Sequence, residues 1–197
     1  MAIWFSSDYH LGHTNILDYS QRPFANVTAM EDAILDRVNT SVGPEDVLYF
    51  LGDFCMGIGR DVLSERVAAY RARIRCRNVH LIWGNHDRRE VLSSPGLFAS
   101  TSDLLPIKAG SRHGVLCHYA MRVWDKSHTG RSFQLYGHDH GTLPEVPSLP
   151  AFDVGVDCWN FWPISIEQVI EVLAHKKSGG RAADLTIIEG QLASRNP

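Results

Sequence analysis

Five short polar clusters hold the residues whose types and spacing suit metal or acid–base chemistry. Aspartate, histidine and asparagine dominate them, and nearly all directly follow an apolar run. The clusters are Asp8-Tyr9-His10, Gly52-Asp53, Gly84-Asn85-His86-Asp87, the isolated His118, and Gly137-His138-Asp139-His140. Each cluster alone is a weak signal, because a single polar residue after a strand is most often a cap or a loop residue. Gathered at one edge of a sheet, they would be costly to desolvate unless cations satisfied them.

The ligand types narrow the choice of metal. Carboxylate, imidazole and amide oxygen suit divalent manganese, iron, zinc, nickel or cobalt, whereas structural zinc would use cysteines. The four cysteines are widely spaced and form no CxxC pair, so we interpret them as reduced thiols. In an extended segment, two residues separated by one point to the same face. We therefore expect Asp8 with His10, and His138 with His140, each to bind from one side.

These clusters need a sheet that brings them together. Apolar runs rich in β-forming residues predict strands over residues 2–6, 47–51, 79–83, 115–117 and 133–136. Strands alternating with helices in the first half predict a parallel sheet, and the shorter strands of the second half predict added antiparallel pairing. The fold class is thus an α/β or α+β layered domain. Ligand sites in such sheets lie beyond the carboxyl ends of the strands.

Helical spacing of apolar residues predicts three helices and the cap of the first. The helices cover residues 27–38, 61–75 and 166–175, with Asn26 or Thr28 as the cap, and a Gly-rich turn leads into a strand over 185–188. The 197 residues, 44% hydrophobic and 21% charged, fit a single domain whose last few residues are frayed. We expect no second domain.

Charge and hydropathy limit the partners. The net charge of −3 argues against a generally basic surface for nucleic acid. Five arginines do gather between Arg66 and Arg77, where a solvated helix face and a phosphate-binding surface are the two alternatives. No apolar run is long enough to cross a bilayer, and we expect no secretory leader. These features predict a cytoplasmic protein without membrane contact.

The ordered set of clusters resembles the calcineurin-like metallophosphoesterase superfamily. Its blocks run D-x-H, G-D, G-N-H-D/E, an isolated H and G-H-x-H, and all five are present between residues 8 and 140. The opening segment from Trp4 to Ile16 further resembles small stand-alone bacterial and phage members. The resemblance implies a sandwich of two mixed β-sheets flanked by helices, and two divalent transition-metal ions, manganese first.

The resemblance also implies how the ligands divide. Asp8, His10, Asp53 and His140 would hold the first ion, and Asp53, Asn85, His118 and His138 the second. Asp53 would bridge the two ions, which repel each other and need a shared anion. A hydroxide between the ions would attack phosphorus at neutral pH.

The same resemblance implies which residues take part in proton transfer. His86 would protonate the leaving group, with Asp87 orienting its imidazole. Other residues after the first predicted strand, namely His13, Asn15 and Arg22, could contact the substrate phosphate, Arg22 through a bidentate fork. The alternative for these three is a structural role, with Arg22 pairing only with an acid.

The expected function is hydrolysis of a phosphate ester, with a small phosphodiester or a nucleotide-type substrate favoured over a monoester. The same dinuclear centre serves both ester types. One alternative is a nuclease of the same superfamily, which would need a basic groove for its strand. The other is a non-catalytic scaffold that binds proteins. Scaffolds of this kind lose ligands, whereas this chain keeps them all.

Overall fold

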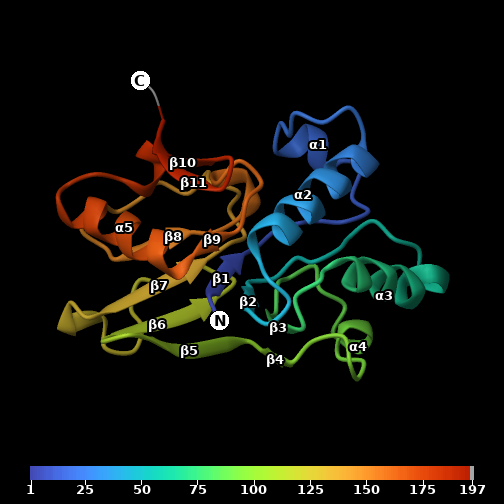
Figure 1. Ribbon diagram of the computed structural model, residues 1–197, viewed down its shortest axis with the longest axis horizontal. Coiled ribbons are helices and arrows are strands. Elements are labelled where there is room, and N and C mark those ends of the chain that lie inside the picture. The colour runs from blue at the N-terminus through green and yellow to red at the C-terminus, as the bar shows by residue number, and fades with distance from the viewer. Residues whose placement is uncertain (196–197) are drawn as a thin grey trace.

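The polar clusters follow strands of a five-stranded sheet and a four-stranded sheet in the computed structural model, which describes residues 1–195 (Figure 1). The first sheet has the order β4-β3-β2-β1-β9. Its strands are β1 (Ile3–Ser6), β2 (Val47–Phe50), β3 (Asn78–Ile82), β4 (Ser100–Ser102) and β9 (Ile164–Ser165). Strands β1 to β4 are parallel, and β9 is antiparallel to β1.

The second sheet has the order β5-β6-β7-β8. Its strands are β5 (Leu104–Ala109), β6 (Arg112–Cys117), β7 (Ser132–Tyr136) and β8 (Ala151–Asp153). Only β5 and β6 are antiparallel, whereas β6, β7 and β8 run parallel. The expected antiparallel character of the second half is therefore only partly right. A hairpin of β10 (Leu185–Ile188) and β11 (Gln191–Ser194) follows.

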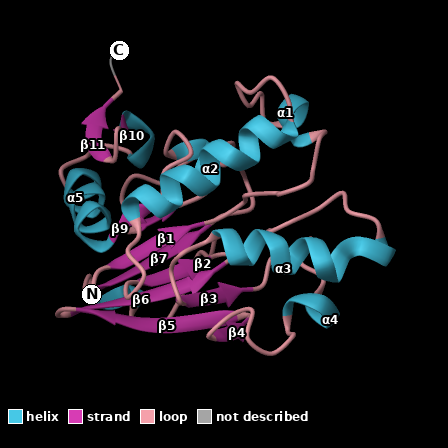
Figure 2. Cartoon of the chain, turned by 45° about the vertical axis from the view of Figure 1, so that its right-hand side comes forward, coloured by secondary structure: helices cyan, strands magenta, loops and turns pink. Residues whose placement is uncertain are grey.

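Helices α2 and α3 run along one side of the strands, and α5 lies beside β9 (Figure 2). The long helices are α2 (Val27–Ser41), α3 (Leu63–Arg73) and α5 (Ile166–Lys177), and the short ones α1 (Ile16–Tyr19) and α4 (Arg89–Leu92). Asn26 caps α2 as predicted, its side chain accepting from the Ala29 N–H. The helix predicted over 61–75 starts later, because one 3-10 turn precedes Leu63. The predicted layered sandwich of two mixed sheets flanked by helices is confirmed.

Strand periodicity divides the buried side chains between two cores. Leu48 and Phe50 of β2 pack toward α2 and α3. Tyr49 and Leu51 point to the opposite side, where the two sheets and α5 meet. Both sheet faces are thus covered, which fixes the strand register firmly.

Parallel strands bring the polar clusters to one edge. Strands β1, β2 and β3 are neighbours with their carboxyl ends together, and the same holds for β6, β7 and β8. A bridge between Ser7 and Gly155 joins the loop after β1 to the loop after β8. The carboxyl ends of the two sheets therefore meet, as the sequence predicts.

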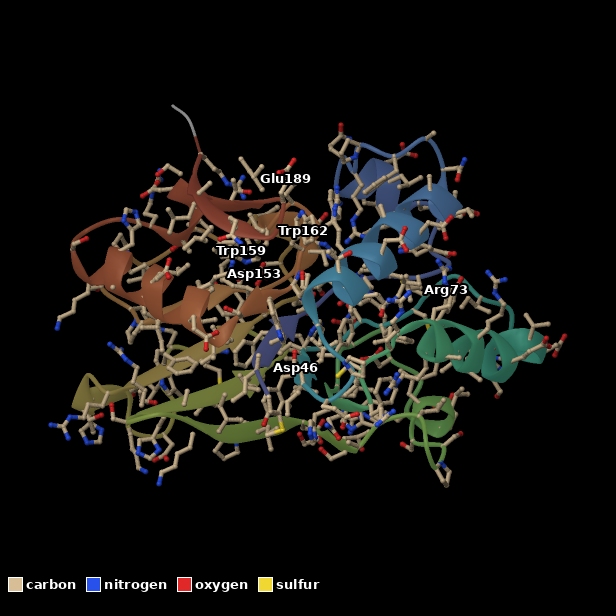
Figure 3. The ribbon with its side chains drawn as sticks, viewed as in Figure 1. Asp46, Arg73, Asp153, Trp159, Trp162 and Glu189 are labelled. Atoms are coloured by element: carbon tan, nitrogen blue, oxygen red, sulfur yellow. The ribbon has the colours of Figure 1, made fainter. Side chains whose placement is uncertain are left out.

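The arginines of α3 are mostly occupied by local contacts. Arg71 donates to the carbonyls of Ile74, Cys76 and Leu97, and Arg73 forms an exposed ion pair with Asp32. Arg73 also lies far from Asp153 at the end of β8 (Figure 3). This arrangement favours the solvated helix face over a phosphate-binding surface. In the described part of the chain, no helix has the length and hydropathy to cross a membrane. The predicted fraying of the last few residues falls partly on residues 196–197, which lie outside the described range.

Candidate metal centre

Six of the seven predicted ligands form two groups of three. The first group is Asp8, His10 and His140, and the second group is Asp53, His118 and His138. Within each group, one possible ligand atom of every residue lies within 4.8 Å of the others. The seventh residue, Asn85, joins the second group, since its Oδ1 lies 3.0 Å from His118 Nε2. The structure thus brings all seven residues together.

Asp53 lies between the two groups. Its Oδ2 is 3.6 Å from His10 Nε2 of the first group and 3.5 Å from His118 Nε2 of the second. Its other oxygen accepts the backbone N–H of His86 at 2.9 Å, which fixes the carboxylate plane. One oxygen of Asp53 therefore faces both groups.

The ligand backbones are left-handed, not extended. Ten non-glycine residues of the described chain have positive φ, and five of them are predicted ligands: Asp8, His10, Asp53, His138 and His140. Such conformations cost about 1–3 kcal/mol each and persist where the surrounding structure imposes them. The expectation based on strand periodicity is wrong for His138 and His140, because both lie after β7 and belong to different groups.

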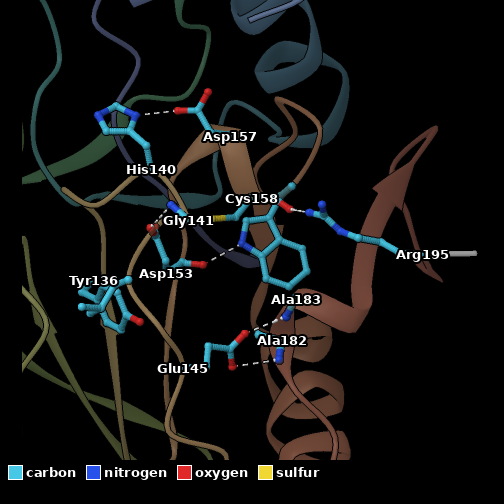
Figure 4. Close-up of a pocket in the computed structure, with 12 residues that line it drawn as sticks. Tyr136, His140, Gly141, Glu145, Asp153, Asp157, Cys158, Ala182, Ala183 and Arg195 are labelled. Carbon is cyan, nitrogen blue, oxygen red and sulfur yellow. Dashed lines mark hydrogen bonds and ion pairs between the residues drawn. The ribbon is translucent and has the colours of Figure 1, made fainter. Parts of the chain in front are cut away.

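Two ligand histidines are oriented through their second ring nitrogen. His118 Nδ1 lies 2.7 Å from the carbonyl oxygen of Leu51. His140 Nδ1 lies 2.7 Å from Asp157 Oδ2 (Figure 4). A partner at Nδ1 fixes the ring and leaves Nε2 for a metal, as is usual for ligating histidines. Both rings are therefore held ready for an ion.

Arg22 holds the side chain and loop of this centre in place, and we call this set of contacts a brace. The expectation that Arg22 contacts substrate is wrong, and the structural alternative is favoured. Its Nε and Nη2 form a bidentate pair with Asp157 at 2.8 and 2.7 Å. Nη2 and Nη1 also donate to the carbonyls of Asp8 and Tyr9 at 2.7 and 3.0 Å. The guanidinium is fully buried, so a substrate cannot reach it. Its positive charge instead fixes both the Asp8 loop and the partner of His140.

Asp87 also takes a different place from the one expected. One carboxylate oxygen accepts the N–H of Phe54 at 2.9 Å, and the other accepts those of Asp53 and Gly84 at 3.0 and 2.9 Å. The buried carboxylate thus ties the loop after β2 to the loop after β3. Its hydrogen bonds within the described residues go to these amides, so orientation of His86 is not its role.

His86, His13 and Asn15 line one hollow in front of the centre, of about 730 Å³. Ligands His10 and His140 form part of its wall. The His86 side chain is exposed, and its ring centroid lies 5.6 Å from that of His10. These three residues therefore lie beside the predicted ligands, with His86 and Asn15 exposed and His13 half-buried, where a substrate would enter.

Glycines let the loops approach the ligands. A Cβ on Gly84 would lie 2.2 Å from Asp53 Oδ1, and one on Gly137 would lie 2.4 Å from Asp8 Oδ2. Both distances are far below van der Waals contact. Each position therefore requires glycine if the carboxylates are to keep their places.

Burial and charge shift the ligand pKa values. Burial, together with the nearby charge of Asp153, raises the pKa of Asp8 to about 7. Burial lowers the pKa of His10 to about 3, so this imidazole is neutral. For His118, burial acts downward but its contact with Asp53 prevails and raises the pKa to about 9. Against the upward effect of burial, His118 in turn lowers the pKa of Asp53 to about 2.

The donor set fits two divalent ions. Both ring nitrogens of His10 are buried without a hydrogen-bond partner among the described residues, which is costly unless another group satisfies them. His10 Nε2 points to the space it shares with Asp53. A neutral imidazole and a carboxylate around such a space match the ligands of a transition metal. Asp53 Oδ2 lies within 3.6 Å of imidazole nitrogens of both groups.

Sequence reasoning missed Asp153 and Asp157. Asp153 accepts the N–H groups of Gly141 and Gly155 and adjoins a cavity of about 200 Å³ behind the centre (Figure 4). Asp157 pairs with His140 and Arg22. Asp153 ends β8 and Asp157 lies shortly after it, much as the other clusters lie at the ends of their strands. That signal was present, but the apolar run before it is only Ala151-Phe152, after a proline-rich loop.

The sequence model of the calcineurin-like phosphoesterases matches residues 1–185. Among curated relatives, an uncharacterised protein of Methanocaldococcus jannaschii, MJ1445, is 25% identical over 89% of this chain and 93% of its own length. The Gene 66 protein of Mycobacterium phage D29 is 28% identical over 80% of this chain and 89% of its own.

A solved structure agrees with the fold. The protein of unknown function AQ665 from Aquifex aeolicus superposes with a TM-score of 0.69 at 21% identity, covering 86% of this chain and 98% of that one. This likeness concerns the fold alone. The match of the family sequence model covers nearly the whole chain and includes all the clusters described above. The chain therefore belongs to the calcineurin-like phosphoesterase family.

Proposed function

We propose that the chain is a dinuclear-metal-dependent phosphodiesterase acting on a small or nucleotide-type ester. The observation that carries this proposal is the place of Asp53 Oδ2, 3.6 and 3.5 Å from imidazole nitrogens of the two groups. Two dications in adjacent groups repel each other, and a shared carboxylate offsets that repulsion. When held by these two groups, the ions would supply Lewis acidity and would activate water for attack at neutral pH.

Manganese is the proposed native metal. The residues offer carboxylate, imidazole and amide oxygen without thiolate. This set accepts manganese, iron, zinc, nickel or cobalt, and cellular availability decides among them. Metal analysis of protein purified without chelators tests this choice, and a different stoichiometric metal would replace manganese in the proposal.

His86 is the proposed proton donor to the leaving oxygen. Its backbone N–H is held by Asp53 Oδ1, so its position is coupled to the shared carboxylate. Its side chain is exposed and lines the hollow. A His86→Ala variant should keep its metal and lose activity mainly on alkyl esters, because such leaving groups need a proton. Unchanged rates on an alkyl phosphodiester would remove His86 from this role.

A diester is favoured because the centre opens into a broad hollow of about 730 Å³, not into a closed pocket fitted to a small monoester. The nuclease alternative has less support, since Arg71 and Arg73 of α3 are engaged in local contacts and Arg73 lies away from Asp153, which adjoins the centre (Figure 3). The scaffold alternative would leave the assembled ligand groups unused. Hydrolysis of a small ester is the simplest use of these residues.

Activity and metal content together test this function. The protein with and without manganese is assayed on bis-p-nitrophenyl phosphate, p-nitrophenyl phosphate and 2′,3′-cyclic nucleotides. We expect manganese-dependent cleavage, strongest on the diesters, that Asp53→Asn lowers by about 10³-fold or more. Asp32→Asn, at an exposed ion pair, is the matched control and should behave as the parent protein. Full activity in Asp53→Asn would reject the mechanism.

A reducing, cytoplasmic location is also proposed. All four cysteines are free thiols, and Cys55 and Cys76 are buried. Unpaired buried thiols are typical of compartments that keep cysteine reduced. Fractionation of the source cells would test this location, and recovery outside the cytoplasm would contradict it.

A further inference from the structure

A second hollow borders the centre at Asn85, and its lining does not include His86. It has a volume of about 570 Å³ and its lining includes Trp83, Asn85, Arg89, Leu104 and Tyr119. We call it the Tyr119 hollow, and the one of about 730 Å³ the His86 hollow. No described residue lines both. Asn85 and His86 are adjacent in sequence yet line different hollows, so the centre borders two hollows with different linings.

Tyr119 forms a wall between the second group and this hollow. Its ring packs edge-on against His118 and His138, with centroids 5.1 and 4.8 Å apart. These contacts hold the ring, and 46% of the residue is still exposed. Leu104, also among the exposed large hydrophobic residues, adds a further apolar surface. A held, half-exposed aromatic ring beside a reaction centre is suited to stacking on a planar group.

The Tyr119 hollow also offers polar groups of both kinds. The Arg89 guanidinium lies over the ring of Trp83, 5.3 Å from its centroid, and pairs with Asp103. Arginine supplies donors and aspartate supplies acceptors. An aromatic face combined with donors and acceptors matches a nucleobase, which stacks through its face and hydrogen-bonds through its edge.

We propose that the Tyr119 hollow binds the nucleoside arm of a phosphodiester and that the other arm leaves through the His86 hollow. This inference rests on the proposed function. Of the two hollows, His86 lines only the His86 hollow, so the oxygen that His86 protonates belongs to the arm that lies there. Water forms the new bond to phosphorus and releases one proton, the bond to the leaving oxygen breaks, and His86 gives that oxygen a proton. The proton released by water returns His86 to its protonated form, so the step balances. The products are a nucleoside monophosphate and an alcohol.

The regiochemistry of one substrate tests this orientation. Thymidine 5′-ethyl phosphate carries two primary alkoxide leaving groups of similar basicity, so chemistry alone selects neither. With the manganese-loaded protein we expect thymidine 5′-monophosphate and ethanol. Thymidine and ethyl phosphate as the main products would overturn the proposal. The product ratio does not depend on the overall rate, so partial loss of activity does not obscure it.

Matched variants connect the selectivity to the hollow. Tyr119→Ala should lower the ratio of the two product pairs about tenfold, because one stacked base contributes ~1–3 kcal/mol. Tyr119→Phe keeps the ring and should keep the ratio. Tyr19→Ala removes an exposed ring of the His86 hollow and should also keep it. A ratio that falls equally in the Tyr19 and Tyr119 variants would overturn the assignment.

Equilibrium binding separates this inference from the proposed function. Calorimetry on the manganese-loaded protein compares thymidine 5′-monophosphate with ethyl phosphate. We expect the nucleotide to bind about tenfold more tightly, a preference that Tyr119→Ala removes. If neither ester bond is cleaved but this preference holds, the hydrolytic function fails and the binding site stands. Equal affinities in the parent protein would reject the nucleoside site.

Discussion

The first group and the second group differ in what holds their histidines. His140 of the first group is held by the Asp157 side chain, whose charge is balanced by buried Arg22. His118 of the second group is held by the backbone carbonyl of Leu51. A brace made of side chains can be removed by substitution, whereas a backbone carbonyl stays whatever the residue. The first group should therefore be the more vulnerable half of the centre.

The largest effect should come from removing Arg22. An Arg22→Met variant leaves the buried Asp157 charge and two carbonyls without their donor, which costs about 3–5 kcal/mol of unfolding free energy. Urea unfolding measures the loss. The double variant Arg22→Met/Asp157→Leu removes both charges and should recover part of it. Equal stability of the single variant and the parent would contradict the buried brace.

Substitution of Asp157 should separate the two groups. Asp157→Asn weakens the orientation of His140, so we expect the first ion to bind about 10–100-fold more weakly and the second to be unaffected. Two-site calorimetric titration with manganese measures both affinities. Asp184→Asn removes a carboxylate from an exposed pair and is the control. If both affinities fall equally, the contacts that orient His140 and those that orient His118 do not act independently.

Acid should also distinguish the groups. Asp8 has a raised pKa of about 7, so below this pH it is protonated and an ion must displace that proton. The affinity of the first group should rise with pH until Asp8 has lost its proton near pH 7 and His140 has lost its own, whose pKa is raised by Asp157 against the downward effect of burial. His118 holds its proton up to about pH 9, so the second group should keep gaining affinity to that value. Titrations from pH 6 to 9 test this, and a common plateau would contradict it.

A helix-cap variant should have the smallest effect. It tests whether a general loss of stability is enough to change the metal affinities. Ser165 caps α5, its side chain accepting from Gln168 in a capping box. Ser165→Ala should cost about 1 kcal/mol of unfolding free energy. It should leave both metal affinities unchanged, because α5 supplies no ligand. A loss of first-group affinity as large as that of Asp157→Asn would mean that general destabilisation, not the brace, controls the site.

Much of the fold was predictable because its signals are local. The runs before Asp8, Asp53, Asn85, His118 and His138 are strongly apolar, and helical spacing marks α2, α3 and α5. Strands β4, β8 and β9 have two or three residues, too few for a periodic pattern. Their places come from pairing with distant strands, which local sequence does not encode.

The candidate ligands were also predictable from the sequence, but the roles of the residues that hold them in place were not. Residue types and order pointed to the seven ligands. The roles of Arg22 and Asp87 depend on which carbonyls and amides lie within reach after folding. The left-handed backbones of His138 and His140 likewise depend on packing from both sheets. Spacing alone predicts that these two histidines bind from the same side. That prediction fails because their backbones are left-handed and not extended.

The pairing of Arg22 with Asp157 has a consequence for how the chain folds. Arg22 and Asp157 are 135 residues apart in the sequence. The charge of Arg22 therefore stays uncompensated until most of the chain has been synthesised. Contacts of such long range are completed late, because the intervening loop must first close. During synthesis, the second group has all its ligands before Asp157 is made. The first group becomes fully braced only afterwards, so the order of synthesis itself separates the two halves of the centre.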